Sequence, residues 1–356
     1  MRRRTGWIGA TGAVAAAALV GLYPLPADAH GGGTAFMQEN LVSDQPGAAA
    51  VTDPNLVNAW GMSHGPNTPV WVSDNGADVA TLYRTDTPGQ PVTPQALVVS
   101  IPGGAPTGQV FNDTTAFTVP GTGSKALFMF AGENGTLSAW NQSAGTSAVS
   151  VGDIPAGTVY KGLALDHSPF GPLLLATDFH DNRIDVFDAS FTRLPVDRLF
   201  QDPSLPRGYA PFNVAEIGSQ IFVTYAKQDA DRHDDVAGHG HGFVDVYTNY
   251  GVLEHRFASR GVLNSPWGMV IAPASFGDFA GDLLIGNFGD GRIHAFDPQS
   301  GRLVGTLSTA KHKPIVIDGL WGLIVGDQAA GGTDSVWFSA GPDEESHGLL
   351  GLLRAG

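Results

Sequence analysis

The feature that most constrains the fold is a unit that occurs six times after residue 55. Each copy is marked by a residue pair whose second member is glycine in five of the six copies. Successive pairs lie about 50 residues apart, a spacing typical of propeller blades and unlike that of helical solenoids. The six pairs are Trp60-Gly61, Thr107-Gly108, Lys161-Gly162, Phe212-Asn213, Trp267-Gly268 and Trp321-Gly322. The repeat therefore predicts a six-bladed β-propeller.

Each pair leads into an apolar stretch, a second strand, a turn and a third strand. Residues 183–188 and 292–297 alternate apolar and polar side chains, as half-buried strands do. Sustained helical periodicity is absent from the sequence, which favours an all-β protein. The blades are expected at approximately residues 55–102, 105–155, 159–200, 209–260, 265–308 and 317–354.

The last blade has sequence candidates for three strands, ending at residues 348–353, whereas a propeller blade normally has four. The spare segment is residues 36–43, which precede the first blade. We expect this N-terminal strand to pair with the last blade. Such pairing closes the ring and removes an exposed sheet edge.

The amino-terminal segment has the pattern of a secretory signal peptide. Three arginines at residues 2–4 precede an apolar run at residues 8–22, and Ala27-Asp28-Ala29 forms a cleavage site before His30. We expect cleavage near Ala29 and export of residues 30–356 as a single propeller domain, through either the Sec or the twin-arginine route. The apolar run is too short to span a bilayer and no later segment qualifies, so no membrane span is expected.

The whole chain carries a net charge of −15, and removal of residues 1–29 takes away three arginines and one aspartate. A protein this acidic repels phosphate backbones and anionic lipid surfaces, which argues against nucleic acid as a partner. The chain has no cysteine, so disulfides and thiol chemistry are excluded and stability must come from the core. We expect a monomer without a nucleotide cofactor.

Seven motifs cover nearly the whole mature chain. They are N-L-V-S-D-Q-P-G at 40–47, A-T-D-F-H at 176–180, Y-A-P-F-N at 209–213, V-T-Y-A-K-Q-D at 223–229, N-S-P-W-G at 264–268, G-N-F-G-D-G-R-I at 286–293 and D-G-L-W-G-L at 318–323. With them the chain resembles an uncharacterised family of secreted bacterial propeller proteins, some of which end in a PEP-CTERM-type sorting tail. The resemblance implies a propeller and an extracytoplasmic location, with no assigned reaction.

In a propeller, the start of each first strand and the end of each second strand lie on one face near the axis, where function is expected. Second-strand ends form the column Asp74, Ala131, Asp178, Ala226, Asn287 and Ala340. Two places further on lie Gly76, Glu133, His180, Gln228, Gly289 and Pro342. Both columns vary in chemistry between blades, which a scaffold does not require. On the first strand, Lys161 and Asn213 break the repeat, and such exceptions are expected at functional positions.

These positions define the candidate site. The catalytic candidates are Asp178, His180, Glu133 and Lys161; the substrate-binding candidates are Asn213, Lys227 and Gln228; and the metal candidates are Asp74, Asp178 and Asn287. Several acids around one mouth repel each other, so a proton or a cation should lie among them. Oxygen ligands suit calcium foremost, or magnesium, whereas including His180 favours zinc, manganese or iron. Alternatively, these side chains cap strand ends and bond to neighbouring turns.

Blade four carries a long connection at residues 229–241 that is expected to overhang the same mouth. His239 and His241 are two positions apart, so an extended backbone would point both to one side, as an alternative metal site requires. The other interpretation is a solvated acidic lid whose histidines have no ligand role.

Two functional hypotheses follow. The first is a secreted metal-assisted hydrolase of a small polar ester, lactone or sugar-derived substrate, in which a metal polarises a carbonyl or activates water. Asp178 or Glu133 would then act as base, and Lys161 or His180 would steady the oxyanion. The second is a non-catalytic extracellular module that binds a glycan or a protein. Tightly bound metal would favour the first hypothesis.

Overall fold

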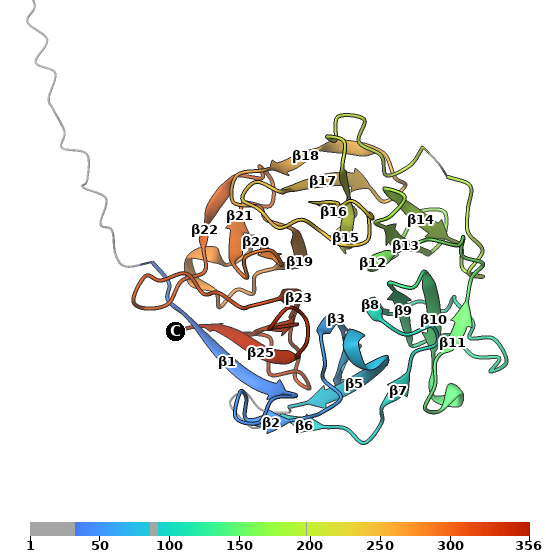
Figure 1. Ribbon diagram of the computed structural model, residues 1–356, viewed down its shortest axis with the longest axis horizontal. Helices are drawn as coiled ribbons and strands as arrows, with labels where there is room; N and C mark the ends of the chain where they lie inside the picture. The colour runs from blue at the N-terminus through green and yellow to red at the C-terminus, as the bar shows by residue number, and fades with distance from the viewer. Residues whose placement is uncertain (1–32, 86–91, 197) are drawn as a thin grey trace, which may run out of the picture. The chain divides into compact units, whose positions relative to one another are not determined.

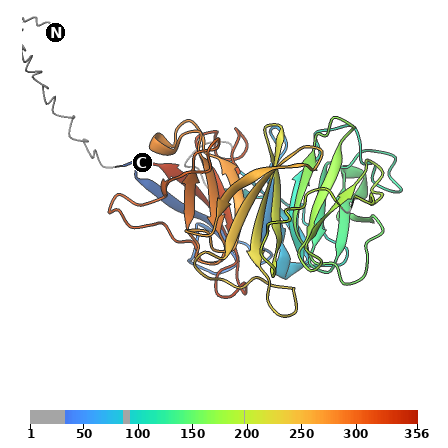
Figure 2. The same cartoon turned by 90° about the horizontal axis from the view of Figure 1, so that it is seen from above.

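The computed structural model describes residues 33–85, 92–196 and 198–356. Their strands form six sheets arranged in a ring, with the first strand of each sheet nearest the axis (Figure 1). The strands run between the two faces of this ring (Figure 2). The predicted all-β, six-bladed propeller is therefore confirmed. The predicted signal peptide, residues 1–29, and His30 lie outside the described residues.

The strands follow the predicted repeat. Blade one contains β3 (Ala59–Ser63), β4 (Val70–Asp74), β5 (Val79–Arg84), β6 (Thr93–Pro94) and β7 (Val99–Ser100). Blade two contains β8 (Pro106–Phe111), β9 (Phe128–Gly132), β10 (Thr136–Trp140) and β11 (Val149–Val151). Blade three contains β12 (Tyr160–Asp166), β13 (Leu173–Asp178) and β14 (Arg183–Phe187).

The remaining blades are built in the same way. Blade four contains β15 (Tyr209–Ile217), β16 (Gln220–Lys227), β17 (Gly242–Thr248) and β18 (Leu253–Ser259). Blade five contains β19 (Pro266–Ile271), β20 (Leu283–Asn287), β21 (Ile293–Phe296) and β22 (Leu303–Thr306). Blade six contains β23 (Leu320–Val325), β24 (Val336–Ala340), β25 (Leu349–Ala355), β1 (Phe36–Ser43) and β2 (Val51–Thr52).

The glycine of the repeated pair lies where neighbouring first strands approach each other around the axis. In all six blades, the register between the first and second strands shifts at this step. A Cβ atom on Gly108 would lie 2.4 Å from the backbone nitrogen of Leu163 in the next blade, and one on Gly61 would lie 2.3 Å from the carbonyl oxygen of Thr107. The repeat is glycine because a side chain would collide with the adjacent blade.

The hydrophobic core lies mainly between adjacent blades. One cluster joins Leu284 and Ile293 of blade five to Val336 and Phe338 of blade six. A separate aromatic cluster lies around the axis, contributed by five of the blades, and we call it the aromatic floor. Its members are Trp60, Phe179, Ala210, Phe212, Ala226, Trp267 and Trp321. Within the floor, the rings of Trp60 and Trp321 stack with centroids 3.6 Å apart.

The N-terminal strand β1 closes the ring, as predicted. It pairs antiparallel with β25, from Phe36 opposite Ala355 to Ser43 opposite Leu349. The hydroxyl of Ser43 also donates a hydrogen bond to the carbonyl of Gly348 at 2.8 Å. Blade six is thus assembled from both ends of the propeller sequence, and its outer edge is covered.

Helix is confined to three short 3₁₀ turns among the described residues, Asn75–Ala77, Gln142–Ala144 and Gly277–Phe279. Within the same ranges, no helix has the length and apolarity needed to cross a bilayer.

Candidate functional site

A buried ammonium lies at the face of the ring where the first strands begin. We call this face, with Lys161, Glu133, Asp234 and Glu345, the mouth. Lys161 is the second residue of β12 and its side chain is only 2% exposed. Its Nζ forms an ion pair with Oε1 of Glu133, from the turn after β9, and lies 3.2 Å from Oδ1 of Asp234. It also lies 5.2 Å from the ring centroid of Trp60 in the aromatic floor.

The mouth keeps this ammonium charged. Burial on its own lowers the pKa of Lys161, but the negative charges of Glu133 and Asp234 outweigh burial and leave the pKa raised. The same ammonium lowers the pKa of Asp234 against the opposing effect of burial. The acids of the mouth therefore share a cation that belongs to the protein itself.

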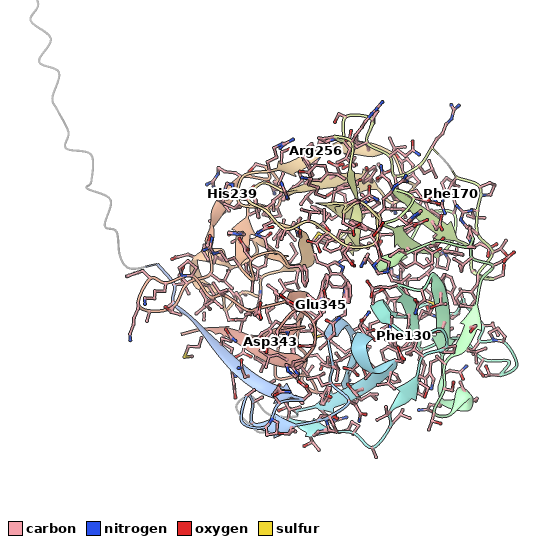
Figure 3. The ribbon with its side chains drawn as sticks, in the orientation of Figure 1. Phe130, Phe170, His239, Arg256, Asp343 and Glu345 are labelled. Carbon is pink, nitrogen blue, oxygen red and sulfur yellow. The ribbon has the colours of Figure 1, made fainter. Side chains whose placement is uncertain are left out.

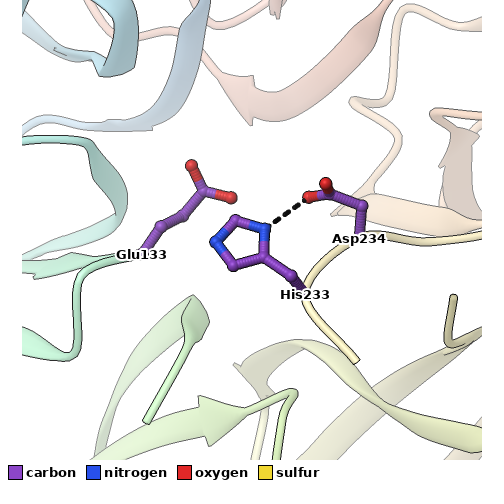
Figure 4. A group of neighbouring side chains, drawn as sticks. All are labelled: Glu133, His233 and Asp234. Atoms are coloured by element: carbon purple, nitrogen blue, oxygen red, sulfur yellow. Dashed lines mark hydrogen bonds and ion pairs between the residues drawn. The ribbon is translucent and has the colours of Figure 1, made fainter. Parts of the chain in front are cut away.

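Asp234 comes from the long connection between β16 and β17, residues 229–241, which reaches over the mouth as its position in the chain predicted. The connection is turned back on itself because Oδ1 of Asp229 accepts a hydrogen bond from the backbone N–H of His233 at 2.9 Å. The imidazole Nδ1 of His233 then lies 2.9 Å from Oδ1 of Asp234 (Figure 4). This loop delivers a carboxylate and an imidazole to the same place.

Glu133, His233 and Asp234 form a group that could hold a metal ion. One ligand atom from each lies within 4.8 Å of the others, and the three side chains point toward one another (Figure 4). Glu133 is partly buried, whereas His233 and Asp234 are exposed. Two carboxylates with one imidazole are a suitable donor set for a divalent transition metal.

A chain of amide side chains links Glu133 to a second carboxyl group. Asn75 Nδ2 donates to Oε2 of Glu133 at 2.9 Å, and Asn58 Nδ2 donates to Oδ1 of Asn75 at 3.1 Å and to Oε2 of Glu345 at 2.6 Å. Oδ1 of Asn58 accepts from the indole N–H of Trp321 at 3.1 Å, which fixes the orientation of the amide. The aromatic floor thus positions the hydrogen bonds of the mouth.

Glu345 lies at the centre of the ring (Figure 3). Burial, followed by the charge of Glu133, raises its pKa from 4.5 to about 7. The turn that carries it has three successive non-glycine residues in left-handed conformation, with φ of 57° at Asp343, 54° at Glu344 and 66° at Glu345. Left-handed backbone is costly outside glycine and is retained where surrounding contacts impose it, often at functional sites.

The predicted metal ligands Asp74, Asp178 and Asn287 end their second strands as expected. All three are fully buried. The two carboxyl groups have raised pKa values because burial disfavours their charge: that of Asp178 is about 6 and that of Asp74 is well above its ordinary value.

Specific partners hold two of these side chains in place. Oδ2 of Asp178 lies 2.7 Å from a guanidinium nitrogen of Arg183. Asn287 accepts a hydrogen bond from the backbone of Asn264 at 3.1 Å and donates to the carbonyl of Val262 at 2.8 Å. These are the strand-end contacts of the alternative interpretation. The metal assignment to the three residues stays a prediction.

The other predicted residues have varied surroundings. The amide of Asn213 donates to the carbonyl of Trp267 at 2.8 Å and its Oδ1 accepts from the backbone of Val214 at 2.8 Å, so it joins blades four and five. Gln228 donates to the carbonyl of Phe179 at 2.5 Å. His180 is 36% exposed and lies 3.0 Å from Asp181. Lys227, partly buried, ends β16.

The alternative histidine pair lies at the end of the loop that leads into β17, after His233 and Asp234. His239 lies over the outer part of the ring, away from Glu345 (Figure 3). Nδ1 of His241 lies 2.8 Å from the carbonyl of Val236, within the same loop. The metal-ligand role of this pair also stays a prediction.

The mouth therefore unites Glu133 and Lys161, which the sequence columns singled out, with Asp234, His233 and Glu345, which they did not. Asp234 and His233 lie in the predicted overhanging loop. The histidine spacing pointed to His239 and His241 at the end of this loop, whereas the group with Glu133 uses residues nearer its middle. Glu345 lies three places after Pro342, beyond the two columns compared, so the comparison of blades did not reach it.

Solved structures with similar backbones are propeller proteins, which agrees with the fold. A Bacteroides thetaiotaomicron protein of unknown function has a TM-score of 0.55 at 15% identity, with 90% of this chain and 76% of that chain covered. A streptogramin B lyase has a TM-score of 0.50 at 11% identity, with 90% of this chain and 97% of that chain covered. At these identities the likeness concerns the fold alone.

No family model matches the chain. Its sequence is, however, similar to uncharacterized proteins of Acanthamoeba polyphaga mimivirus. One is 36% identical over 328 residues, covering 88% of this chain and 78% of the viral protein. Another is 36% identical over 329 residues, covering 88% of this chain and 84% of the viral protein. The predicted resemblance to an uncharacterised family is confirmed, with viral relatives, and the chain belongs to the family of these mimivirus proteins.

Proposed function

We propose that the mouth is the active site of a metal-assisted hydrolase that acts on a small polar ester, lactone or sugar-derived molecule. The observation that carries this proposal is the convergence of Glu133, His233 and Asp234, with ligand atoms within 4.8 Å, beside the buried ammonium of Lys161. In the proposed site these three side chains hold a divalent cation. Such a cation polarises a carbonyl oxygen and lowers the pKa of bound water.

The protein's own groups supply the remaining chemistry. Glu345 is the proposed general base, because its pKa of about 7 lets it accept a proton near neutral pH. The ammonium of Lys161, fixed and desolvated over the aromatic floor, is placed to stabilise a developing oxyanion. Asp178, which with Glu133 was one of the two bases expected from the sequence, remains the rival proposal.

A second candidate function is a non-catalytic module that binds a glycan or another polar ligand. The observation that favours it is the ion pairing of Lys161 with both Glu133 and Asp234. The ammonium already offsets their charges, so the mouth has less need of a metal. Hydroxyl groups of a sugar could then bond directly to these carboxylates.

We further propose that the protein acts outside the cytoplasm, on the strength of the signal-peptide pattern in residues 1–29.

Metal binding tests the two functions. Purified protein is titrated separately with Zn²⁺, Mn²⁺ and Ca²⁺ by calorimetry, and its bound metal is measured after dialysis. The hydrolase proposal expects one ion per chain, weakened at least tenfold by His233→Ala or Asp234→Asn. Asp231→Asn removes a charge from an exposed residue of the same loop and should leave the affinity unchanged. Failure of all three ions to bind would contradict the proposal and favour the binding module.

Two further variants identify which metal site is used, and a third tests the proposed general base. Loss of metal in Asp178→Asn, with retention in His233→Ala, would support the ligands predicted from the sequence. Loss only in the double variant His239→Ala and His241→Ala would support the histidine pair. Glu345→Gln should abolish hydrolysis in a panel of small esters and lactones while it preserves metal content, because this residue is proposed as a base and not as a ligand.

A further inference from the structure

A cavity of about 370 Å³ opens on the face opposite the mouth, where the first strands of the blades end. Strand β12 contributes to both faces, because Lys161 lies near its start and Leu165 near its end. At about 3.3 Å per residue, these two positions are about 13 Å apart along the strand. The aromatic floor lies between the faces, so the cavity and the mouth are separate sites.

Apolar side chains from neighbouring first strands form the walls of the cavity. They include Met62, Phe111, Leu163, Val214 and Ile324. A smaller recess of about 130 Å³ continues toward the axis, shares part of this lining and is bounded by Trp267 of the aromatic floor. The volume is at the lower end of the range for small-molecule sites, and the walls favour an apolar ligand.

The rim of the cavity carries a histidine held between two carboxylates. Nε2 of His167 lies 2.9 Å from Oδ1 of Asp113, and Nδ1 lies 2.5 Å from Oε2 of Glu216. Each ring nitrogen faces a carboxylate oxygen, and an ionised carboxylate can only accept a hydrogen bond. Both ring nitrogens therefore donate, which makes the ring an imidazolium. Its hydrogen bond to Glu216 is the largest cause of a raised pKa. One positive charge thus offsets only one of the two carboxylates.

A third carboxyl group adjoins this rim. Asp166 is completely buried, and neither of its oxygens has a hydrogen-bond partner within the part of the chain that the structure describes. Burial, followed by the charge of Glu216, raises its pKa to about 7. Across the cavity, Nε2 of His64 lies 2.9 Å from the carbonyl of Val325 and its Nδ1 lies 3.7 Å from Oδ2 of Asp327. Acidic groups are therefore in excess around an apolar recess.

We propose that this cavity binds a small apolar molecule that carries one protonated amine. The ammonium lies at Glu216, where it supplies the positive charge that His167 provides only in part. The apolar part fills the space between Phe111, Met62 and Leu163. A carboxylate of the same shape is repelled by Asp113 and Glu216, and a neutral molecule lacks the ionic contact. This ligand site is independent of the chemistry proposed for the mouth.

Three probes with the same phenyl-ethyl body test the proposal on the unmodified protein. Phenethylamine, 2-phenylethanol and phenylacetate are titrated separately at low ionic strength by calorimetry or protein NMR. We expect phenethylamine to bind and the other two to bind roughly tenfold more weakly or not at all, with the difference reduced by added salt. Equal binding of the alcohol, tighter binding of phenylacetate, or no binding of the amine would overturn the proposal.

A charge-matched pair of variants locates the binding. Glu216→Gln keeps the shape of a cavity-lining side chain, removes its charge and should weaken phenethylamine binding roughly tenfold. Glu254→Gln removes the same charge from the outer strand β18 of the same blade and should leave the affinity unchanged. An equal loss in both variants would indicate attraction by the acidic surface in general and would overturn the assignment to the cavity. Thermal unfolding of both variants confirms that they are folded.

Discussion

The ammonium of Lys161 and the carboxylate of Glu133 form an ion pair that joins the first strand of blade three to a turn of blade two. The lysine side chain is almost wholly buried, and the glutamate side chain is 13% exposed. A buried charge without its partner is strongly destabilising, whereas the pair as a whole contributes little relative to apolar side chains. Loss of either charge of this ion pair should therefore weaken the packing of blade two against blade three.

Lys161→Met keeps the apolar stem but removes the charge, and we expect it to lower the free energy of unfolding by about 2 to 3 kcal/mol. The loss of stability caused by Lys161→Met should be smaller in a Glu133→Gln background, because residue 133 then carries an uncharged amide and leaves no unpaired charge. A double-mutant cycle by urea denaturation should give a coupling of about 1 to 2 kcal/mol. Lys311→Met, in an exposed loop, is the control and should change stability by less than about 0.5 kcal/mol. Strict additivity in the cycle would show that the pair is not energetically coupled.

Glu345 is expected to make stability fall as pH rises. Its pKa in the folded protein is about 7, above its ordinary value of 4.5, so the folded state holds the proton more tightly than the unfolded state does. Between these two values the unfolded state releases its proton first, and the favourable contribution of the protonated carboxyl is lost by about pH 7. Allowing for partial solvent exposure, the loss is about 1 to 2 kcal/mol.

Glu345→Gln mimics the protonated carboxyl and should remove this dependence. The Tm of the variant relative to the unmodified protein should therefore increase between pH 5 and pH 8. Other buried carboxyl groups also titrate in this range, so the comparison is the difference between variant and parent at each pH. Glu344→Gln in the same turn is exposed and is the matched control. A Glu345→Gln difference that is constant with pH would refute the shifted titration.

The six-fold repeat made the fold predictable from residues alone because it has a steric cause. Gly61 and Gly108 occur where a Cβ atom would collide with the next blade, and glycine recurs at this step in five of the six copies. Lys161 was identifiable for the opposite reason, since it replaces the residues that the repeat has at this step, and Glu133 was identifiable because its column varies in chemistry between blades. Departures from a repeat point to particular chemistry only when the repeat itself is well defined.

The rest of the mouth depends on loop conformation, which no column records. Asp234 reaches Lys161 only because the loop folds back through Asp229, and Glu345 enters the mouth through a left-handed turn. The three strand-end residues expected as metal ligands are a different case. Side chains alternate between the two faces of a strand, so a polar residue such as Asp178 at the strand end can point into its own blade, where it is buried against Arg183.

If the protein is exported as expected, its signal peptide should be removed. Expression in a host with a functional secretory pathway should yield a mature form whose amino terminus lies at or near His30, because Ala27-Asp28-Ala29 is the expected cleavage site. Intact-mass spectrometry of the secreted protein measures this directly. A full-length product that stays in the cytoplasm would contradict it.

Ring closure gives the sharpest stability test of the fold, because the side chain of Phe36 anchors the start of the N-terminal strand. Phe36 is buried, and its ring lies 5.3 Å from that of Phe276 and 5.6 Å from that of Phe279, both in blade five. Its backbone N–H also donates to the carbonyl of Ser308 at 2.9 Å. The start of β1 is therefore held by blade five while the strand itself completes blade six.

Phe36→Ala should lower the free energy of unfolding by about 3 kcal/mol, through lost burial and the cavity left behind. Met37→Ala changes the next residue of β1, which is 59% exposed, and should cost less than about 0.5 kcal/mol. Deletion of residues 30–45 should lower the Tm far more than Phe36→Ala, because it removes the whole strand and exposes the edge of β25. Equal Tm values for the deletion and the parent would mean that the ring does not need this strand. A loss for Phe36→Ala no larger than that for Met37→Ala would mean that the strand is held by its backbone pairing with β25 and not by this aromatic anchor.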